Sequence, residues 1–269
     1  MHHRSICIQL YVLIYLYCYH IDLLDEFLDY QNFIFDEKDI NEIDFLYDCD
    51  YVINTAAETH VDNSIVSSDV FLKSNINGVH HLLNLIQQKS RFNMPTLLHF
   101  STDEVYGDIE EGSHTETDLL KPSNPYSATK AAADHLVTSW GRTYGLPYII
   151  VRPTNNYGIG QYVEKLIPKA VKYLTIDRQI DLHQNGTPVR TWLHVDDTAR
   201  AVLTVIDSGV KNEIFNISGN CELQNIVVVT KIIQAVMGPI EDINAHLRYM
   251  NRPGQDVQGR KSGSHRKRY

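Results

Sequence analysis

Short apolar runs alternate with helix-like segments from Asp50 onward, and this alternation constrains the fold more than any other feature of the sequence. Three runs of four to six residues are typical of buried strands, and they are Tyr51–Asn54, Thr96–Ser101 and Tyr148–Val151. Two stretches with apolar residues at helical spacing lie between them, Val70–Gln88 and Tyr126–Tyr144. Because strands joined by crossover helices pair in parallel, the pattern predicts an α/β fold with a parallel sheet and right-handed crossovers.

Ligands of such a sheet bind beyond the carboxyl ends of its strands, so the residues that follow each apolar run are candidates for chemistry. Three polar or small segments lie there, and they are Ala56-Ala57-Glu58, Thr102-Asp103-Glu104 and Pro153 to Tyr157. After Gly160 the pattern loosens, with helices predicted over Lys169–Leu174 and Val195–Ser208 and a turn at Asn185-Gly186. We expect a smaller, ligand-covering lobe there, interleaved with the sheet.

Composition excludes several classes of protein. The chain has 269 residues and a formal net charge of −9, which argues against general binding of nucleic acid because a phosphate-tracking surface needs positive potential. Its four cysteines, Cys7, Cys18, Cys49 and Cys221, form no C-x-x-C pair, which indicates free thiols in a reducing compartment, the cytoplasm, and predicts no metal site.

The N-terminal region carries an apolar run, Ile6 to Tyr19, followed by an acidic stretch. At 14 residues the run falls short of the roughly 20 needed to span a membrane. A signal peptide is conceivable, but no small-residue cleavage site follows, and a buried strand is the interpretation that we favour. Residues 21–50 hold eleven acidic residues against one base, which predicts a solvated helix face over Ile21, Leu24, Phe27 and Leu28.

Tyr126 and Lys130 form a Y-x-x-x-K pair on a predicted helix. Residues four apart share a helix face, so the ammonium can lower the pKa of the phenol by stabilising the phenolate. A tyrosine base at neutral pH is therefore feasible, although an ordinary surface tyrosine and lysine would give the same pattern.

Thr102-Asp103-Glu104 directly follows a predicted strand. Two adjacent carboxylates in a partly desolvated pocket repel one another and can divide into one protonated acid and one ionised base. Elimination of water needs one group of each kind, an acid and a base. A plain turn after the strand is the alternative for the acidic pair taken by itself.

Several segments together resemble the dTDP-glucose 4,6-dehydratases of the extended short-chain dehydrogenase/reductase superfamily. They are AAETHVDNS (56–64), STDEVYGD (101–108), NPYSATKAAADHLV (124–137), YGLP (144–147), NNYG (155–158), EKLIPK (164–169) and RPG (252–254). The match covers roughly residues 50–256, and T-D-E before V-Y-G is its specific part, since related epimerases and decarboxylases usually lack the Asp-Glu pair.

The resemblance implies a Rossmann-like, doubly wound parallel sheet with an incomplete first βα unit and a smaller C-terminal substrate lobe. We expect an NAD-binding domain over residues 1–157, the lobe over 158–256 and a basic tail over 257–269. It also implies NAD as cofactor, a nucleoside-diphosphate sugar as substrate, and a homodimer formed through the helix that bears Tyr126 and its neighbour.

The resemblance further implies a reaction on one bound sugar nucleotide. Tyr126, assisted by Lys130, takes the proton of the 4-hydroxyl as hydride passes from C4 to NAD, and Thr102 hydrogen-bonds that oxygen. Glu104 then removes the C5 proton while Asp103 protonates the departing 6-hydroxyl, and the hydride returns to C6.

Other positions match binding residues of the family. The implied cofactor contacts are Asp39, Ile40, Ala56, Ala57, Ser74, Tyr126, Lys130 and Asn156, with Thr59 and His60 close by. The implied substrate contacts are Thr102, Asn155, Lys165, Leu166, Arg190, Asn225 and Arg252. Arg190 and Arg252 suit a diphosphate, because a guanidinium offers planar, bidentate donors to phosphate oxygens.

The sequence departs from the family where the glycine-rich pyrophosphate loop should lie, because no glycine occurs before Gly78. Glycine lets backbone amides approach the phosphates without a Cβ atom in the way. Ile6–Tyr19 is a candidate replacement strand, and Asp22 a candidate ribose ligand. The pattern is that of a chain shortened at both ends, and it leaves two alternatives: an active dehydratase, or a catalytically impaired remnant that serves as a binding or partner subunit. A sugar-nucleotide epimerase is a weaker third.

Overall fold

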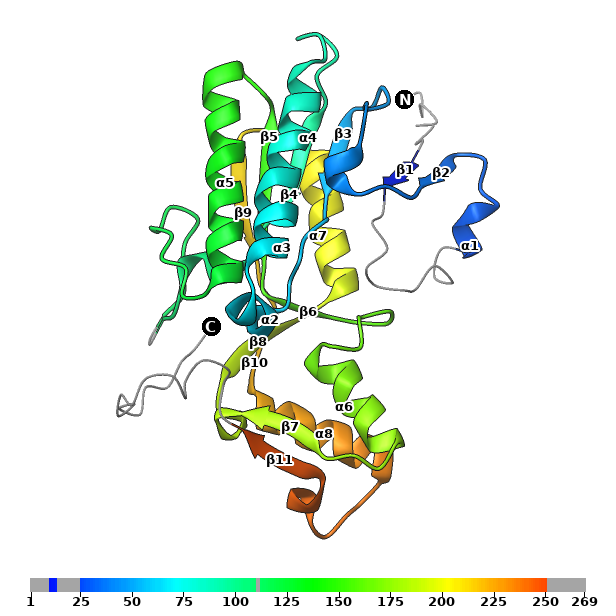
Figure 1. Cartoon of the computed structure of the whole chain (residues 1–269), viewed down its shortest axis with the longest axis vertical. Helices are drawn as coiled ribbons and strands as arrows, with labels where there is room; N and C mark the ends of the chain where they lie inside the picture. Colours follow the sequence, from blue (N-terminus) through cyan, green and yellow to red (C-terminus); the bar gives the residue numbers. More distant parts are fainter. Residues whose placement is uncertain (1–9, 14–24, 110–111, 251–269) are drawn as a thin grey trace.

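The computed structural model describes residues 10–13, 25–109 and 112–250. Figure 1 shows a larger part built around a sheet and, below it, a smaller lobe. No helix among the described residues is long and apolar enough to cross a membrane.

The larger part is organised by a four-stranded parallel sheet with strand order β3-β4-β5-β9. Its strands are β3 (Tyr51–Asn54), β4 (Thr96–Phe100), β5 (Tyr148–Pro153) and β9 (Glu213–Ile217). The three strands predicted from the apolar runs are confirmed. Strand β4 is buried along Thr96 to His99 because it lies between β3 and β5 and is covered on both faces.

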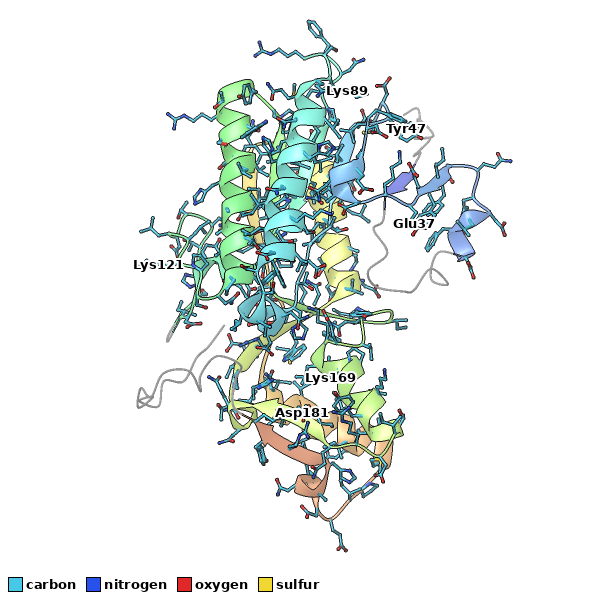
Figure 2. The ribbon with its side chains drawn as sticks, in the orientation of Figure 1. Glu37, Tyr47, Lys89, Lys121, Lys169 and Asp181 are labelled. Atoms are coloured by element: carbon cyan, nitrogen blue, oxygen red, sulfur yellow. The ribbon has the colours of Figure 1, made fainter. Side chains whose placement is uncertain are left out.

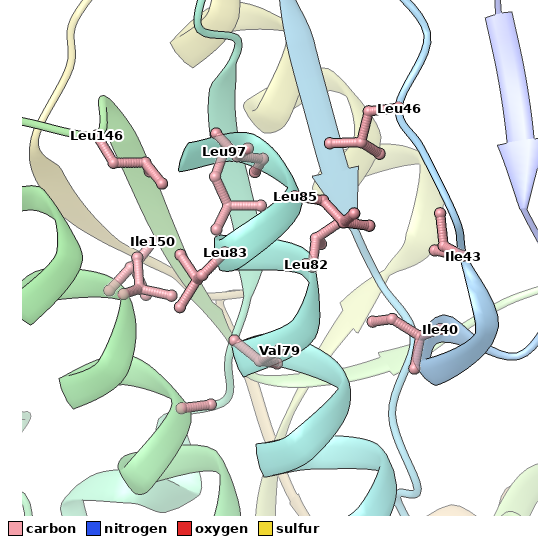
Figure 3. Close-up of a cluster of buried hydrophobic side chains, with 13 residues drawn as sticks. Ile40, Ile43, Leu46, Val79, Leu82, Leu83, Leu85, Leu97, Leu146 and Ile150 are labelled. Atoms are coloured by element: carbon pink, nitrogen blue, oxygen red, sulfur yellow. The ribbon is translucent and has the colours of Figure 1, made fainter. Parts of the chain in front are cut away.

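Helices cover both faces of this sheet. On one face lie α4 (Gly78–Gln87) and α5 (Pro125–Tyr144), and on the other lies α7 (Val195–Ser208) (Figure 1). Leu97 points into the α4 and α5 side, and its neighbour Leu98 into the α7 side, as the two-residue period of a strand requires. Figure 3 shows the first cluster, in which Val79, Leu82 and Leu83 of α4 meet the sheet.

The helix predicted over Val70–Gln88 is present but interrupted. After α2 (Val61–Val66), the chain forms α3 (Asp69–Phe71), a π-helical segment (Leu72–Asn77) and then α4. A π segment adds a residue to a helical turn and so changes which side chains face inward. Here it places Asn75 in the interior, fully buried.

Helix α5 begins and ends at residues suited to those positions. Asn124 caps its N-terminus by accepting a hydrogen bond from the Ser127 amide, and Pro125 occupies the first turn, where no amide donor is needed. The helix ends at Gly145 in the left-handed region (φ 70°), a conformation that glycine adopts at low cost.

The N-terminal residues form a separate two-stranded parallel sheet of β1 (Leu10–Leu13) and β2 (Phe33–Asp36). Strand β1 lies within the apolar run for which a strand was expected. The expected amphipathic helix is wrong in extent: α1 (Asp25–Leu28) is a single turn, and the side chains of Phe27 and Leu28 are 39% and 50% exposed. Ile21, Leu24 and Asp22 lie outside the described residues.

The smaller lobe combines short strands with two helices. A three-stranded sheet has the order β10-β8-β6, and β11 pairs in parallel with β7. Its elements are β6 (Asn155–Tyr157), α6 (Leu166–Thr175), β7 (Ile180–His183), β8 (Val189–His194), β10 (Cys221–Gln224), α8 (Asn225–Met237) and β11 (Leu247–Met250). Between β8 and β10 the chain returns to the larger part to form α7 and β9 (Figure 1).

The core cluster of Figure 3 can be tested by removing one side chain. Leu83→Ala should lower the free energy of unfolding by about 2–5 kcal/mol, because Leu83 is fully buried and truncation leaves a cavity. The matched control Leu119→Ala, at a side chain that is 77% exposed, should stay within about 0.5 kcal/mol. Denaturant titration would measure both, and equal losses would contradict the assigned core.

Candidate active site

The site begins where β4 ends. Thr102 caps a 3₁₀ turn (Asp103–Tyr106), and its hydroxyl accepts a hydrogen bond from the Glu104 amide at 3.3 Å. The turn is closed by Gly107 at φ 85°, where a Cβ atom would lie 2.2 Å from the carbonyl oxygen of Lys121. Lys121 itself lies on the loop that leads to α5 (Figure 2). The sequence therefore needs glycine here to hold both acids at the strand end.

Helix α5 brings Tyr126 and Lys130 to the same edge. Both side chains are buried, at 8% and 3% exposure. The Lys130 ammonium donates a hydrogen bond to the Phe100 carbonyl at 2.6 Å, which ties the helix to the last residue of β4. The Tyr126 amide donates to Ser64 Oγ at 3.1 Å, which fixes the first turn of α5 against α2. The five predicted catalytic residues therefore meet at one end of β4.

Burial and a neighbouring charge favour the protonated form of Asp103. Desolvation, and after it the Glu104 carboxylate, raise the pKa of this carboxyl to about 7, while a hydrogen bond with Thr102 and the charge of Arg190 on β8 act in the opposite direction. The Asn124 side-chain amide donates to Glu104 Oε2 at 3.1 Å and so orients the second acid. The predicted division into a protonated acid and a second, oriented carboxylate thus has a physical basis.

Tyr126 differs from the expectation. Burial raises the pKa of its phenol above the usual value, the Glu104 charge adds to this, and a hydrogen bond with Thr102 opposes it. Burial also lowers the pKa of Lys130 to about 8, with Asp134 opposing. The ammonium that was expected to lower the pKa of the phenol is instead engaged with the Phe100 carbonyl.

Asn75 joins three parts of the site, and sequence reasoning missed it. Its side chain accepts a hydrogen bond from the Glu58 amide at 2.8 Å and donates to the Glu58 carbonyl at 3.0 Å. It also donates to Thr129 Oγ1 on α5 at 2.9 Å. The loop after β3 is thereby held against α5. Because Asn75 faces inward only through the π segment, regular helical periodicity gave no signal for it.

The predicted cofactor residues occupy two places. Asn54 accepts a hydrogen bond from the Ala56 amide at the end of β3, next to Ala57, and Ser74 lies in the π segment. Asp39, by contrast, precedes β3 in the chain and forms an ion pair with Lys73, with 3.3 Å between the carboxylate oxygen Oδ2 and the ammonium nitrogen. Its neighbour Ile40 packs so closely on Gly78 that a Cβ atom there would lie 2.4 Å from it.

The predicted substrate residues lie on the lobe side. Asn155 is in β6, next to the predicted cofactor residue Asn156, which accepts a hydrogen bond from Thr198 of α7. The Lys165 ammonium donates to the hydroxyl of Thr59 at 2.7 Å and to its carbonyl at 3.0 Å, with Leu166 next to it at the start of α6. Asn225 begins α8, and Arg252 lies outside the described residues.

These residues fit one half of NAD. The small side chains of Ala56 and Ala57 lie on the loop that Asn75 holds against α5, the helix of Tyr126 and Lys130, so donors for a nicotinamide ribose lie on neighbouring elements. The pyrophosphate half is not matched, because residues 1–77 contain no glycine to give it unshielded backbone amides. Across the described residues, no group of three or more His, Cys, Asp or Glu could hold a metal ion.

Comparison with known proteins follows this geometry. The NAD dependent epimerase/dehydratase family matches residues 30–218. The chain is similar to the low-salt glycan biosynthesis protein Agl12 of Haloferax volcanii, 40% identical over 82% of this chain and 72% of the relative. It is 37% identical to a dTDP-glucose 4,6-dehydratase of Haemophilus influenzae, over 84% of this chain and 73% of that protein.

Solved structures show the same fold. The dTDP-glucose 4,6-dehydratase DesIV of Streptomyces venezuelae, solved with NAD bound, is 32% identical with a TM-score of 0.82, over 94% of this chain and 81% of DesIV. A UDP-glucuronic acid 4-epimerase of Bacillus cereus is 23% identical with a TM-score of 0.78, over 86% of this chain and 73% of that one, which shows the fold alone.

The protonation of Asp103 makes a prediction about stability. Between pH about 4 and about 7 the folded chain keeps the Asp103 proton that the unfolded chain loses, so this group lowers the free energy of unfolding as pH rises. Asp103→Asn cannot ionise and should be more stable than the wild type by about 2–4 kcal/mol at pH 8, with little difference at pH 4. Denaturant titrations at both pH values measure this.

The exposed Asp207 supplies the control. Asp207→Asn should show no such dependence on pH. A difference between Asp103→Asn and wild type that is the same at pH 4 and pH 8 would contradict the assigned protonation state.

Proposed function

The chain belongs to the NAD dependent epimerase/dehydratase family, and we propose that it dehydrates a nucleoside-diphosphate glucose, dTDP-glucose or UDP-glucose, to the 4-keto-6-deoxy sugar nucleotide. The family resemblance and the Rossmann-like parallel sheet expected from the sequence are confirmed. One observation carries the proposal: Asp103, whose pKa is raised to about 7 by burial and by Glu104, and Glu104, which Asn124 orients, follow β4 beside Tyr126.

This pair favours dehydration over epimerisation. Inverting a hydroxyl needs a base and a hydride acceptor, whereas expelling the 6-hydroxyl needs an acid and a second base at C5. Asp103 holds a proton near neutral pH, and Asn124 holds Glu104 in place. An epimerase would gain nothing from desolvating the Asp103 carboxyl, since this costs free energy.

When bound, NAD would supply the hydride acceptor and donor that the oxidation at C4 and the reduction at C6 need. The chain's own residues move the protons. Thr102 hydrogen-bonds the 4-oxygen, Tyr126 takes its proton, Glu104 removes the proton at C5, and Asp103 protonates the departing 6-hydroxyl. Because burial and Glu104 keep the phenol neutral, Tyr126 becomes a base in this proposal only if the Lys130 ammonium leaves the Phe100 carbonyl and turns toward the phenol.

The lobe binds the nucleotide end of the substrate in this proposal. Arg190 lies close enough to Asp103 for its charge to lower the pKa of this carboxyl. A diphosphate bound by Arg190 would therefore lie next to the sugar on which Asp103 acts. Lys165, half-buried at the start of α6, adds a second cation at Thr59. A homodimer through α4 and α5 also belongs to the proposal, since the two helices lie side by side (Figure 1). Tyr144 at the end of α5 and Leu72, in the π-helical segment before α4, are exposed.

The alternative, an impaired remnant that binds a nucleotide sugar or a partner subunit, is favoured by one observation. Residues 1–77 lack glycine, so the pyrophosphate loses its backbone donors. The affinity for NAD separates the two functions.

We expect the 269-residue chain to bind NAD weakly. A micromolar Kd corresponds to about 8 kcal/mol, and losing about half of this with the phosphate cradle moves Kd to about 1 mM. Isothermal titration calorimetry with NAD measures it. Stoichiometric binding at micromolar concentration would contradict the expectation and indicate another binding site for the pyrophosphate of NAD.

The role of Glu104 can be tested by isotope exchange. With saturating NAD and dTDP-glucose in deuterated water, Glu104→Gln should slow incorporation of deuterium at C5 by about 10²–10⁴-fold, because the amide cannot accept the proton. Gln keeps the oxygen that accepts from Asn124, so the local geometry is retained.

The control for this experiment is Glu37→Gln, at the exposed acid labelled in Figure 2, which should exchange at the wild-type rate. Undiminished exchange in Glu104→Gln would remove Glu104 from the proposed mechanism.

A further inference from the structure

Asp134 is a buried acid of α5 that the proposed mechanism does not use. Its side chain is 1% exposed, and it follows Lys130, which is 3% exposed, by four residues on the same helix. Residues four apart share one helix face. Both side chains also reach neighbouring residues of β4. The Lys130 ammonium donates to the Phe100 carbonyl at 2.6 Å, and Asp134 Oδ1 lies 4.0 Å from Nε2 of His99. The carboxylate and the ammonium are therefore neighbours in the interior of the protein.

Arg152 of β5 holds the Asp134 carboxylate in place. Its Nε donates a hydrogen bond to Asp134 Oδ2 at 3.0 Å, and its Nη1 donates to the Tyr106 hydroxyl at 2.6 Å. Burial raises the pKa of the Asp134 carboxyl, whereas the charges of Arg152 and Lys130 lower it. Because the guanidinium is itself buried and stays charged, it needs the ionised form of Asp134 as its partner.

His99 faces the same carboxylate without adding a positive charge. Asn54 Nδ2 lies 3.1 Å from His99 Nδ1, while Asn54 Oδ1 accepts a hydrogen bond from the Ala56 amide. An amide nitrogen can only donate, so His99 Nδ1 accepts and the ring proton is on Nε2, on the side of Asp134. Burial, and after it the Lys130 charge, lower the pKa of His99 well below its usual value, so the ring is neutral.

Lys130 needs a counter-charge, because burial favours the neutral amine. Desolvation lowers the pKa of Lys130 to about 8, and the Asp134 charge opposes this. The other titratable or charged groups around the pair, from α5, β4, β5 and the turn after β4, are Tyr126, His99, Arg152, Asp103 and Glu104. Burial and Glu104 raise the pKa of Tyr126, and Asp134 adds to this, so Asp134 can favour the phenolate only through Lys130.

We propose that Asp134 is a positioning residue of this site: its carboxylate, fixed by Arg152, keeps the buried Lys130 amine in its charged form one helical turn from Tyr126. The role in catalysis rests on the proposed function, whereas the charge pair itself does not. When the ammonium leaves the Phe100 carbonyl and turns toward the phenol, as the proposed reaction requires, it keeps Asp134 as its counter-charge and so remains an ammonium.

The test uses the full chain without substrate, labelled with ¹³C and ¹⁵N and followed by NMR as a function of pH. In Asp134→Asn the midpoint of the Lys130 ¹³Cε signal should fall by about one pH unit or more from a wild-type value of about 8, because the opposite charge is lost. Asp134→Asn combined with Arg152→Gln should show the same fall. This double variant leaves no buried guanidinium unpaired, so it serves where the single variant does not fold.

Lys130→Met gives the reciprocal measurement on a chain that keeps the ion pair of Asp134 with Arg152. Coupling between two sites is equal in both directions, so the midpoint of the Asp134 ¹³Cγ signal should rise by a similar amount. The matched control is Asp181→Asn, which removes the acid of another Asp–Arg pair, with Arg248 at 2.6 Å, in the smaller lobe (Figure 2). It should leave both midpoints unchanged.

Two results overturn the inference. One is an unchanged Lys130 midpoint in the Asp134 variants, and the other is an unchanged Asp134 midpoint in Lys130→Met.

The pH profile of the reaction separates this role from a purely structural one. With saturating NAD and dTDP-glucose, Asp134→Asn should move the alkaline fall in kcat about one unit lower and keep kcat near the wild-type value at pH 6, where Lys130 stays protonated. Asp181→Asn should keep the wild-type profile. Loss of kcat by the same factor at every pH contradicts the positioning role. Failure of the wild-type chain to form product counts against the dehydratase proposal, and the NMR midpoints then decide the inference.

Discussion

The hydrogen bond from the Lys130 ammonium to the Phe100 carbonyl is the contact on which the geometry of the site depends. It joins the helix that carries Tyr126 to the strand whose end carries the two acids. One turn further along α5, Asp134 forms a buried ion pair with Arg152 of β5 at 3.0 Å. The helix is thus fixed to two adjacent strands by charged groups that are costly to leave unpaired, so its position relative to the sheet edge is well determined.

One physical cause sets the electrostatics of this site. Desolvation is the largest influence on Asp103, Tyr126 and Lys130, and it moves each toward its neutral form. For Asp103 this is the state that a general acid needs. For Tyr126 it is the opposite of what a base needs. In the proposed reaction the site therefore favours protonation of the leaving group and depends on added positive charge for the first step.

The two halves of the molecule are matched unequally to a dinucleotide. Near the end of β4, Asn75 joins the loop after β3 to α5 through buried hydrogen bonds, and these hold one side of the proposed sugar site in place. Toward the N-terminus, β1 and β2 pair only with each other among the described strands, and Ile53 of β3 is 46% exposed. The part of the chain around β4 and α5 therefore suits the proposed chemistry, whereas the N-terminal part is less well matched to the dinucleotide.

The sequence by itself determined the parallel sheet, the helix carrying Tyr126 and Lys130, and the location of Asp103 and Glu104 at a strand end, because apolar periodicity and strand-end position are local properties. Only the tertiary structure decided that Lys130 would bond to Phe100, that Asn75 would face inward through a π segment, and that burial would raise the pKa of the Asp103 carboxyl. Those outcomes depend on burial and on contacts between residues far apart in the chain. The pKa of Tyr126 shows the difference, since its neighbour in sequence predicts a lowered value and its surroundings in space raise it.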